Sequence, residues 1–369
     1  MARALGIISF SASNKHVEEM GDFRPTAAFT ILGRYRLIDF PVSNMSNSNI
    51  DRIQVYVNKR PRSLVKHLGT GRQYNINSMT GNMSVLFTDS KPANYDTDIA
   101  AYAENMDEVE LKSNQYVVIA PSDMIYVQDF DELLQGHIAS EADITLLYHT
   151  TDQAKTKFQT CNCVELNKQK GVVSLEPNKG TAANRQISMD TYVMSKKLFM
   201  SLVAEAQNIS SMYTMAQMIN EKCGELDVRG VAHRGYFAAI TDFKSYYDLN
   251  MELLNYKTAQ TLFSDKWPIY TQTNNSCPTQ YFENADVKGA IISNGSLIDG
   301  TIENSIIGRG CLIEKGAVVK NCIISAGVTI GKDVHIENQV VDKYAKIKKM
   351  KEIVASEDNP GYIRRRDNI

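Results

Sequence analysis

The sequence has no excess of charge of either sign. Its 40 basic and 42 acidic residues leave a formal net charge of -2 over 369 residues. Proteins that bind nucleic acid generally carry a strongly basic face, so this balance gives no support for a general nucleic-acid binder. It leaves room for a local basic site that takes a phosphorylated ligand.

Long apolar runs and paired cysteines are also missing. No apolar stretch approaches the roughly 20 residues that span a bilayer, so we expect no membrane segment. The six cysteines include no CxxC pair. We interpret each of them as a small apolar side chain rather than a metal ligand, because free cysteine is commonly buried. The expected compartment is the cytoplasm.

The N-terminal two thirds of the chain alternates apolar, strand-like runs with helical stretches, which predicts βαβ units and a mixed, mostly parallel sheet in a Rossmann-like α/β domain. Strands are expected at Ala4–Phe10, Arg52–Val57, Tyr116–Ala120, Asp143–Tyr148 and Leu226–Val231. Helices are expected at Arg62–Leu68, Asp98–Val109, Phe130–Ala139, Lys197–Ala206, Met212–Lys222 and from Phe243 to about Thr261. Ligands bind beyond the carboxyl ends of such strands, so function should be sought after Phe10 and after Ala120.

The last part of the chain has a different sequence pattern: aliphatic residues recur every six residues, with one step of five. The aliphatic anchors are Ile307, Ile313, Val319, Ile324, Ile330 and Ile336. Period six predicts a left-handed parallel β-helix built from hexapeptide repeats; the alternative is an irregular antiparallel β-domain. The predicted organisation is a domain over 1–260, a linker over 261–285, the β-helix over 286–345 and a C-terminal tail over 346–369. We expect the end of this tail, Ile363-Arg364-Arg365-Arg366, to be solvated; its charge leaves a role in anion binding as the alternative.

Three segments resemble one known family. The run from Gly33 to Asn44, GRYRLIDFPVSN, is similar to the GGKYRIIDFPLSN segment of bacterial and plant ADP-glucose pyrophosphorylases, the glucose-1-phosphate adenylyltransferases. The run Ala120–Tyr126 resembles that family's SGDHIY strand end, and 235–250 resembles its GYW…SYYEAN segment. The resemblance implies a nucleotidyltransferase domain followed by a β-helix. It also implies a tetramer under allosteric control that joins ATP and glucose 1-phosphate into ADP-glucose and pyrophosphate for glycogen or starch synthesis.

The resemblance implies a GGxGxRL loop after the first strand, where glycines let backbone N–H groups approach a triphosphate. Here the same place reads Ser9-Phe10-Ser11-Ala12-Ser13-Asn14-Lys15, with neither glycine nor arginine. Phe10 puts a ring where the phosphates would lie, although the serines offer hydroxyl groups and Lys15 a charge. We therefore expect a degenerate nucleotide loop.

The resemblance also implies two aspartates that bind Mg²⁺, which prefers oxygen ligands. One is present as Asp123; the second position falls on Ala239, whose methyl group cannot ligate. Asp242 lies three residues further on and would need a shifted loop. Asp123 is weighed about equally as a residue that caps the turn after its strand. We expect no metal on this chain, or Asp123 alone if any.

The family's EKP triplet carries a lysine that holds the sugar phosphate. This chain has Leu175-Glu176-Pro177 there, so Glu176 takes the lysine position and would repel a phosphate dianion. Phe10, Ala239 and Glu176 thus each stand where the resemblance implies a residue needed for catalysis. We therefore expect no catalytic residue in the chain.

The activator-binding region of the family is better preserved. Arg24, Arg34 and Arg36 are the candidate effector-binding residues, because the guanidinium fork suits phosphorylated metabolites. Thr26 replaces the lysine of the family's RAKPAV segment. The alternative is that each arginine pairs with an acid at a domain or subunit interface.

These features resemble the noncatalytic second subunit of some Gram-positive bacteria, often called the GlgD type. That reading implies a catalytic subunit as partner, Mg²⁺ for the partner's reaction only, no cofactor for this chain, and a phosphorylated metabolite as effector. One alternative is an active sugar-phosphate nucleotidyltransferase with an atypical phosphate loop. Two others are an acyltransferase that uses His335 on the β-helix and a purely structural assembly module.

Overall fold

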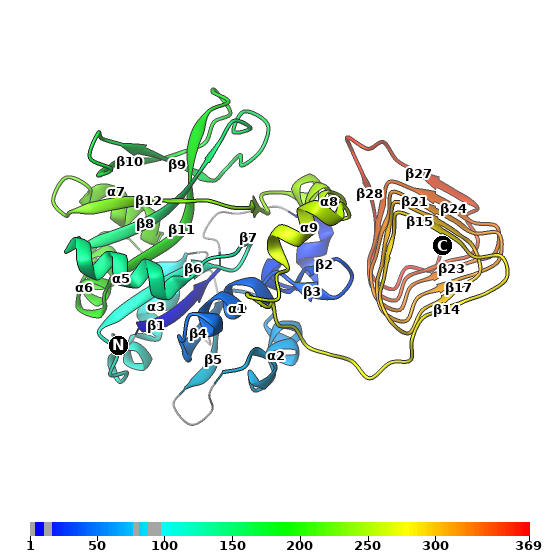
Figure 1. Ribbon diagram of the computed structural model, residues 1–369, viewed down its shortest axis with the longest axis horizontal. Coiled ribbons are helices and arrows are strands. Elements are labelled where there is room, and N and C mark those ends of the chain that lie inside the picture. Colours follow the sequence, from blue (N-terminus) through cyan, green and yellow to red (C-terminus); the bar gives the residue numbers. More distant parts are fainter. Residues whose placement is uncertain (1–3, 11–16, 77–80, 88–96, 211) are drawn as a thin grey trace.

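The computed structural model describes residues 4–10, 17–76, 81–87, 97–210 and 212–369. An N-terminal α/β domain and a C-terminal triangular β-helix lie side by side, and an extended segment joins them (Figure 1). No helix within the described residues is both long enough and apolar enough to cross a bilayer.

A mixed sheet, nine-stranded in the described residues, forms the centre of the N-terminal domain. Its parallel part has β1 (Ala4–Ser9) between β6 (Tyr116–Pro121) and β4 (Arg52–Val57), with β5 (Asn82–Phe87) beside β4. β1 is buried along its whole length, because the sheet is covered on both faces. The carboxyl ends of β1 and β6 therefore open onto the same edge of the sheet.

The other part of the sheet is organised around β11 (Arg185–Ser195), which is antiparallel to its neighbours. The remaining strands here are β8 (Ile144–Thr151), β9 (Asn162–Leu166), β10 (Val172–Pro177) and β12 (Val228–His233). The register of β11 with β8 shifts between Ser188 and Thr191, and Asp190 has a φ of +43°. Such a bulge re-aims a side chain, and here it turns Asp190 toward the cleft described below.

Helices and short strands complete the domain. The α-helices are α1 (Asp39–Asn47), α2 (Arg62–Leu68), α3 (Asp98–Glu104), α4 (Met106–Glu110), α5 (Phe130–Ser140), α6 (Lys196–Ile209), α7 (Met215–Lys222), α8 (Phe243–Glu252) and α9 (Tyr256–Leu262). The 3₁₀ turns are η1 (Glu18–Asp22), η2 (Thr26–Ala28) and η3 (Arg72–Tyr74). Two small antiparallel pairs are β2 (Thr30–Ile31) with β3 (Tyr35–Arg36), and β7 (Met124–Tyr126) with β13 (Phe237–Ala239).

Two predicted helices are each divided into two. The run predicted over Asp98–Val109 breaks at Asn105, whose Nδ2 donates to the Ala101 carbonyl and ends α3. The run predicted from Phe243 breaks before α9, where the Asn255 side chain accepts from the Lys257 N–H. Asparagine competes for backbone hydrogen bonds in this way, so it favours helix ends over helix interiors.

The C-terminal domain is a parallel β-helix with three sheets of five strands each. The strands are β14 (Gln280–Tyr281), β15 (Asp286–Lys288), β16 (Ile291–Ile292), β17 (Leu297–Ile298), β18 (Thr301–Glu303), β19 (Ile306–Ile307), β20 (Leu312–Ile313), β21 (Val318–Lys320), β22 (Ile323–Ile324), β23 (Thr329–Ile330), β24 (His335–Glu337), β25 (Gln339–Val341), β26 (Lys346–Ile347), β27 (Glu352–Val354) and β28 (Gly361–Ile363). All six predicted anchors lie in its buried core. The α/β domain followed by a hexapeptide-type β-helix confirms the predicted fold class.

The predicted limits of the β-helix are too narrow at both ends. Its first strand is β14, because Gln280 and Tyr281 already pair with β17. The segment predicted as a solvated tail supplies the last coil: β28 pairs with β25, Ile363 is 5% exposed, and the N–H groups of Lys348 and Lys349 donate to the Ile369 carbonyl. A long insertion between β27 and β28 hides the six-residue period there.

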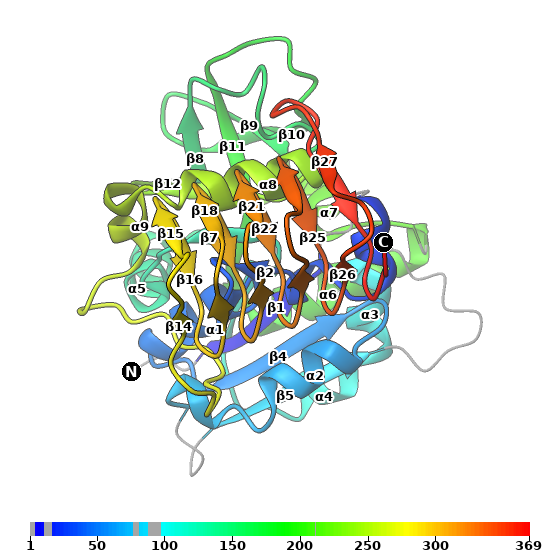
Figure 2. The same ribbon diagram turned by 90° about the vertical axis from the view of Figure 1, so that its right-hand side faces the viewer.

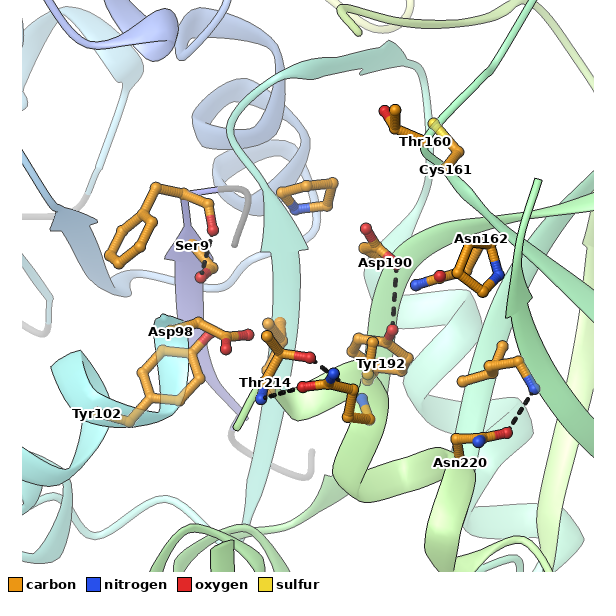
Figure 3. A pocket seen from close by; sticks show the side chains of 17 residues that line it. Ser9, Asp98, Tyr102, Thr160, Cys161, Asn162, Asp190, Tyr192, Thr214 and Asn220 are labelled. Carbon is orange, nitrogen blue, oxygen red and sulfur yellow. Dashed lines mark hydrogen bonds between the residues drawn. The ribbon is translucent and has the colours of Figure 1, made fainter. Parts of the chain in front are cut away.

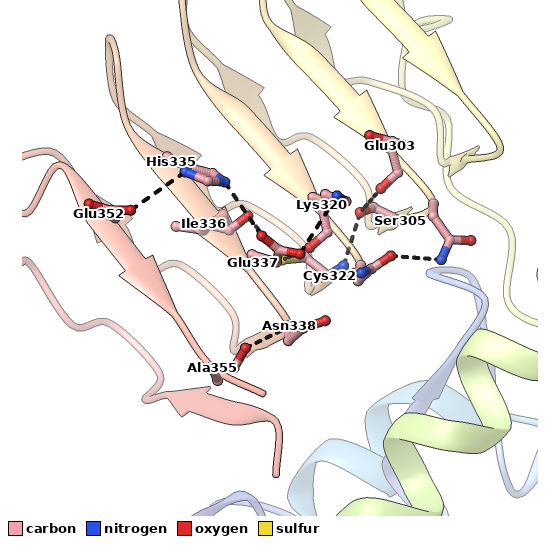
Figure 4. Close-up of polar contacts among 12 residues, drawn as sticks. Glu303, Ser305, Lys320, Cys322, His335, Ile336, Glu337, Asn338, Glu352 and Ala355 are labelled. Carbon is pink, nitrogen blue, oxygen red and sulfur yellow. Dashed lines mark hydrogen bonds and ion pairs between the residues drawn. The ribbon is translucent and has the colours of Figure 1, made fainter. Parts of the chain in front are cut away.

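One corner of the β-helix carries a ladder of asparagines in left-handed backbone conformation. Asn304, Asn321 and Asn338 have φ values of 45°, 49° and 54°. Asn304 Nδ2 donates to Asn321 Oδ1 at 2.7 Å. Asn338 Nδ2 donates to the Ala355 carbonyl at 2.7 Å (Figure 4). Asparagine tolerates this conformation, so it permits the tight corner in each successive coil.

The β16–β19–β22–β25–β28 sheet docks on the N-terminal domain along α8 (Figures 1 and 2). Outward side chains of that sheet, Ile306, Ile323 and Val340, share an apolar cluster with α8. Tyr247 Oη on α8 donates to the Asn321 carbonyl at 2.7 Å. Gly33 (φ +68°) lies so close that an added Cβ would be 3.0 Å from the Ile307 carbonyl oxygen. The two domains therefore form one packed body.

Candidate functional site

A cavity of about 470 Å³ opens at the carboxyl ends of β1 and β6, where the sequence predicts the ligand site. Ser9 ends β1 and Phe10 follows it. Asp98 comes from α3, and Asp190 from the bulge of β11 (Figure 3). The remaining polar lining comes from the β9–β10 hairpin and from α7. The other lining residues are Tyr102, Ile119, Pro121, Thr160, Cys161, Asn162, Leu175, Pro177, Tyr192, Thr214, Ala216, Gln217 and Asn220.

The described residues that line this cavity give it a negative charge. Asp98 and Asp190 line it, and no lysine, arginine or histidine is among the described residues that do so. Two backbone N–H groups, of Ile99 and Met215, donate to Asp98 Oδ1 at 2.9 and 3.1 Å. Burial nevertheless raises the pKa of Asp98 to about 7. Such a cavity opposes a phosphate dianion, because carboxylates and phosphates repel one another in a partly dehydrated site.

The predicted nucleotide loop is described only at its start. Ser9 pairs with Pro121 across β1 and β6, and its hydroxyl donates to the Phe10 carbonyl at 3.1 Å. Phe10 is 8% exposed and packs with the apolar side chains beneath the sheet, so its ring forms part of the cavity wall. Ser11 and Lys15 lie outside the described residues.

The two predicted metal positions are neighbours, as the resemblance implies. Asp123 stands just before β7 and Ala239 ends β13; the strands are paired, and the Ile240 N–H donates to the Asp123 carbonyl at 3.0 Å. Ala239 is 7% exposed and contributes only a methyl group. Asp242 does not replace it, because its carboxylate accepts from the Ser245 N–H at 2.7 Å and caps α8. The side chains present therefore do not fit a two-aspartate magnesium site.

Ala239 faces a second cavity, of about 640 Å³, that is separate from the first. The loop between β8 and β9 divides them, since Gln159 lines the second cavity and Thr160 the first. Phe158 in this loop stacks on Phe237 with centroids 5.2 Å apart and planes at 10°. The described start of the predicted loop thus lines the first cavity, and Ala239, the second predicted metal position, lines the second.

Glu176 lies in β10 with an exposed side chain. Its neighbours Leu175 and Pro177 line the first cavity, whereas Glu176 does not. Successive residues of a strand point to opposite faces, so the carboxylate of Glu176 is directed away from the cavity. The predicted repulsion between Glu176 and a sugar phosphate therefore has no counterpart in this geometry, because Glu176 does not line the cavity.

Of the three predicted effector arginines, Arg24 and Arg36 converge at the junction between the domains. Arg24 is 6% exposed and forms an ion pair with Asp342, which is 1% exposed. Arg36 Nη1 donates to the Ser63 carbonyl at 2.7 Å, and its N–H donates to Asp39 Oδ2 at 2.8 Å. The predicted alternative, pairing with an acid at a domain interface, thus describes Arg24.

Two further cations from the β-helix join this junction. Lys343 follows Asp342; burial, with repulsion from Arg36 and Arg24, lowers the pKa of Lys343 to about 7. Arg365 is close enough to repel Lys343, and its Nε is buried with no hydrogen-bond partner among the described residues. We call Arg24, Arg36, Lys343 and Arg365 the basic junction. The sequence missed Lys343 and Arg365, because only the coil geometry brings 343 and 365 beside 24 and 36.

Arg34 lies apart from the basic junction. It is exposed, its guanidinium carbon is 5.7 Å from the Tyr35 ring centroid, and it lines a third cavity of about 490 Å³ at the start of the β-helix. Arg309 lines the same cavity, and burial together with repulsion from Arg34 lowers the pKa of Arg309. The three predicted arginines therefore belong to two different sites.

His335 is on the outer surface of the β-helix. Its ring nitrogens lie 3.8 Å from Glu337 and 4.0 Å from Glu352, and Lys320 is 3.8 Å from Glu337 (Figure 4). None of the three cavities described here includes His335. This placement favours a charged surface ladder over an acyltransferase histidine.

Comparison with known proteins identifies both domains. Residues 22–256 match the family model described as Nucleotidyl transferase, and residues 278–363 match the one described as GlmU-like, C-terminal hexapeptide. A glucose-1-phosphate adenylyltransferase of Clostridium perfringens (strain SM101 / Type A) is 28% identical over 306 residues, covering 81% of this chain and 78% of the relative. The protein of the same name from Bacillus mycoides (strain KBAB4) is 27% identical over 317 residues, covering 84% and 83%.

Proposed function

Because the chain belongs to the nucleotidyl transferase family, we propose that it is the regulatory subunit of a heteromeric glucose-1-phosphate adenylyltransferase in glycogen biosynthesis. The catalytic partner joins ATP and glucose 1-phosphate into ADP-glucose and pyrophosphate with Mg²⁺. This chain has little or no turnover of its own; it raises the partner's activity or changes the partner's response to effectors, and it requires no cofactor.

The observation that carries the proposal is Ala239 beside Asp123. Adenylyl transfer depends on cations that neutralise phosphate charge at the point of attack. Here a methyl group occupies one of the two positions for metal ligands, and the cavity at the end of β1 is lined by two carboxylates and by no described cation. Within the described residues, the predicted metal position and the first cavity thus each lack a source of positive charge.

The basic junction supports the regulatory half of the proposal. Four cations meet there, and Asp342 forms an ion pair with only one of them, Arg24. Excess positive charge in a buried place favours an anion, and guanidinium groups bind phosphates in paired hydrogen bonds. We propose that a phosphorylated metabolite binds here and that Arg34 belongs to a different site.

The alternative is an active sugar-phosphate nucleotidyltransferase with an atypical phosphate loop. Residues 11–16, which include Ser11 and Lys15, would then supply the contacts that the described residues lack. This alternative requires the chain alone to bind ATP with Mg²⁺.

The deciding experiment measures pyrophosphate release from ATP, glucose 1-phosphate and Mg²⁺ by this chain, by a catalytic subunit, and by the two mixed. We expect no release by this chain and more release by the mixture than by the catalytic subunit alone. Turnover by this chain at a rate similar to its partner's would overturn the regulatory proposal. A mixture no faster and no differently regulated than the partner would leave a structural module instead.

A further inference from the structure

The negative cavity at the end of β1 has the composition of a site for an uncharged, polyhydroxylated ligand. Its charged lining groups are the carboxylates Asp98 and Asp190, and its other polar groups are carboxamides and hydroxyls. A sugar hydroxyl both donates and accepts hydrogen bonds, so it is matched by a mixture of such groups. A phosphate only accepts, so carboxylates give it nothing to bind.

Carboxamide donors line one side of this cavity. Asn220 Oδ1 already accepts from the Leu175 N–H at 2.7 Å, and Gln217 Oε1 accepts from the Thr214 N–H at 2.9 Å. Both amides are thereby fixed in orientation, with the NH₂ group remaining as the donor. Asn162, at the start of β9, makes no side-chain hydrogen bond within the described part of the chain, and its side chain lies at the cavity (Figure 3).

An acceptor stands opposite. Asp98 is held by two backbone N–H groups on Oδ1, which leaves Oδ2 for a ligand hydroxyl. A carboxyl group that titrates near neutral pH is also able to donate when protonated. The volume of about 470 Å³ is within the usual range for small-molecule sites.

A nucleobase fits this cavity less well than a sugar. Bases bind by stacking on exposed aromatic faces. The rings that line the cavity are buried: Tyr102 is 0% exposed, Tyr192 2% and Phe10 8%. The lining therefore offers hydrogen bonds without a stacking platform.

We infer that this cavity binds an uncharged sugar, either a free hexose or the end of a glucan chain, and discriminates against the phosphorylated form. The inference rests on the proposed function only in that the cleft does not catalyse. Through this site the regulatory chain would respond to the concentration of unphosphorylated carbohydrate and not to that of glucose 1-phosphate. The site is distinct from the basic junction, none of whose four cations lines this cavity and where Arg24 pairs with Asp342 of the β-helix.

The test is calorimetry or ligand-observed NMR on the full chain with glucose, maltotriose, glucose 1-phosphate and adenosine. We expect a neutral sugar to bind at least about tenfold more tightly than glucose 1-phosphate, because the phosphate meets carboxylates. Comparing glucose with maltotriose distinguishes a free hexose from a glucan end. If glucose 1-phosphate or adenosine binds as tightly as either sugar, or if neither sugar binds at about 10 mM, the inference is wrong.

Two variants locate the binding. Asn162→Ala removes a donor and should weaken sugar binding about fivefold, the loss of one hydrogen bond. Its matched control is Asn208→Ala, an exposed asparagine of α6 outside the cavity, which should leave binding unchanged. Asp98→Asn keeps an oxygen for the two N–H groups but removes the charge. It should therefore reduce the difference in affinity between glucose and glucose 1-phosphate. If Asn162→Ala and the wild type bind the sugar with equal affinity, the sugar does not bind in this cavity.

The two proposals fail separately. Pyrophosphate release by this chain alone contradicts the regulatory role whatever sugar binds. Tight binding of glucose 1-phosphate without any turnover contradicts only the sugar inference.

Discussion

The cleft at the end of β1 and the basic junction between the domains are both places where phosphate is expected from the resemblance, and they have opposite charge. The cleft has two carboxylates and no cation among its described lining residues. The junction gathers Arg24, Arg36, Lys343 and Arg365 around Asp342. The difference shows that one family fold can carry opposite charges in two places: the described lining of the cleft carries carboxylates, and the domain boundary carries an excess of cations.

The largest expected effect on stability comes from removing the buried ion pair between Arg24 and Asp342. Arg24→Met leaves the buried Asp342 carboxylate with the Tyr362 hydroxyl and the Lys343 backbone N–H as its hydrogen-bond donors among the described residues. We expect the free energy of unfolding to fall by about 3 kcal/mol, as for other broken buried ion pairs. Denaturant unfolding measures it, with Arg24→Met/Asp342→Asn as the control that should recover part of the loss. An Arg24→Met protein as stable as wild type would mean that the junction's cations already neutralise Asp342.

The next largest effect tests the acidity of the cleft. The pKa of Asp98 is raised in the folded state to about 7 from 3.8, so the folded protein binds this proton more tightly and loses stability as pH rises through that window. Asp98→Asn should therefore stabilise the protein by about 2 kcal/mol at pH 8 and have almost no effect at pH 4. Urea unfolding at both pH values checks this. A stabilisation that is equal at pH 4 and pH 8 would show that packing, and not charge, is responsible.

A smaller effect tests the cations of the junction. The pKa of Lys343 is lowered to about 7 from 10.5, so the folded protein gains stability as pH rises from 7 to 10.5 and Lys343 is charged mainly below pH 7. Sulfate, whose charge is constant over this range, should bind up to about tenfold more tightly at pH 6 than at pH 8. Calorimetric titration measures the two affinities. Lys343→Met should abolish the pH dependence; a variant with an unchanged dependence would assign the titration to another group.

The smallest effect concerns Glu176. Because its carboxylate is exposed and directed away from the cleft, Glu176→Lys should change stability by less than about 0.5 kcal/mol and should not increase glucose 1-phosphate binding. Thermal unfolding and a binding titration suffice. If the lysine variant does bind glucose 1-phosphate more tightly than wild type, β10 presents position 176 to the cleft after all.

Local pattern was enough to predict much of the fold. β4 and α2 lie at the residues predicted for them, and the six aliphatic anchors are the interior of the β-helix. These elements depend on periodicity, which a sequence displays directly. The missed elements depend on partners far along the chain: β11 is a strand because it joins β6, β8 and β9, and no alternating pattern marks it off.

The candidate site was predictable in part for the same reason. Asp123 and Ala239 were paired through the resemblance, and the structure brings them together. Asp190 reaches the cleft only through a bulge, and Asp98 only because α3 begins beside α7; neither is visible in local sequence. Lys343 was assigned to the β-helix without a role, because only the coil geometry brings it beside Arg24 and Arg36. Arg365 was assigned to a solvated tail, because the insertion between β27 and β28 interrupts the repeat before the last coil.

Helix α8 has one further consequence. Its cap, Asp242, comes three residues after Ala239, while its outer face carries Tyr247, which bonds to the asparagine ladder of the β-helix. Helix α8 therefore connects β13, the strand that pairs beside Asp123, to the β-helix coil that contains Asn321. A displacement of the coils would therefore reach Ala239 and the second cavity through α8, so the predicted second metal position is tied to the β-helix by the helix that Asp242 caps.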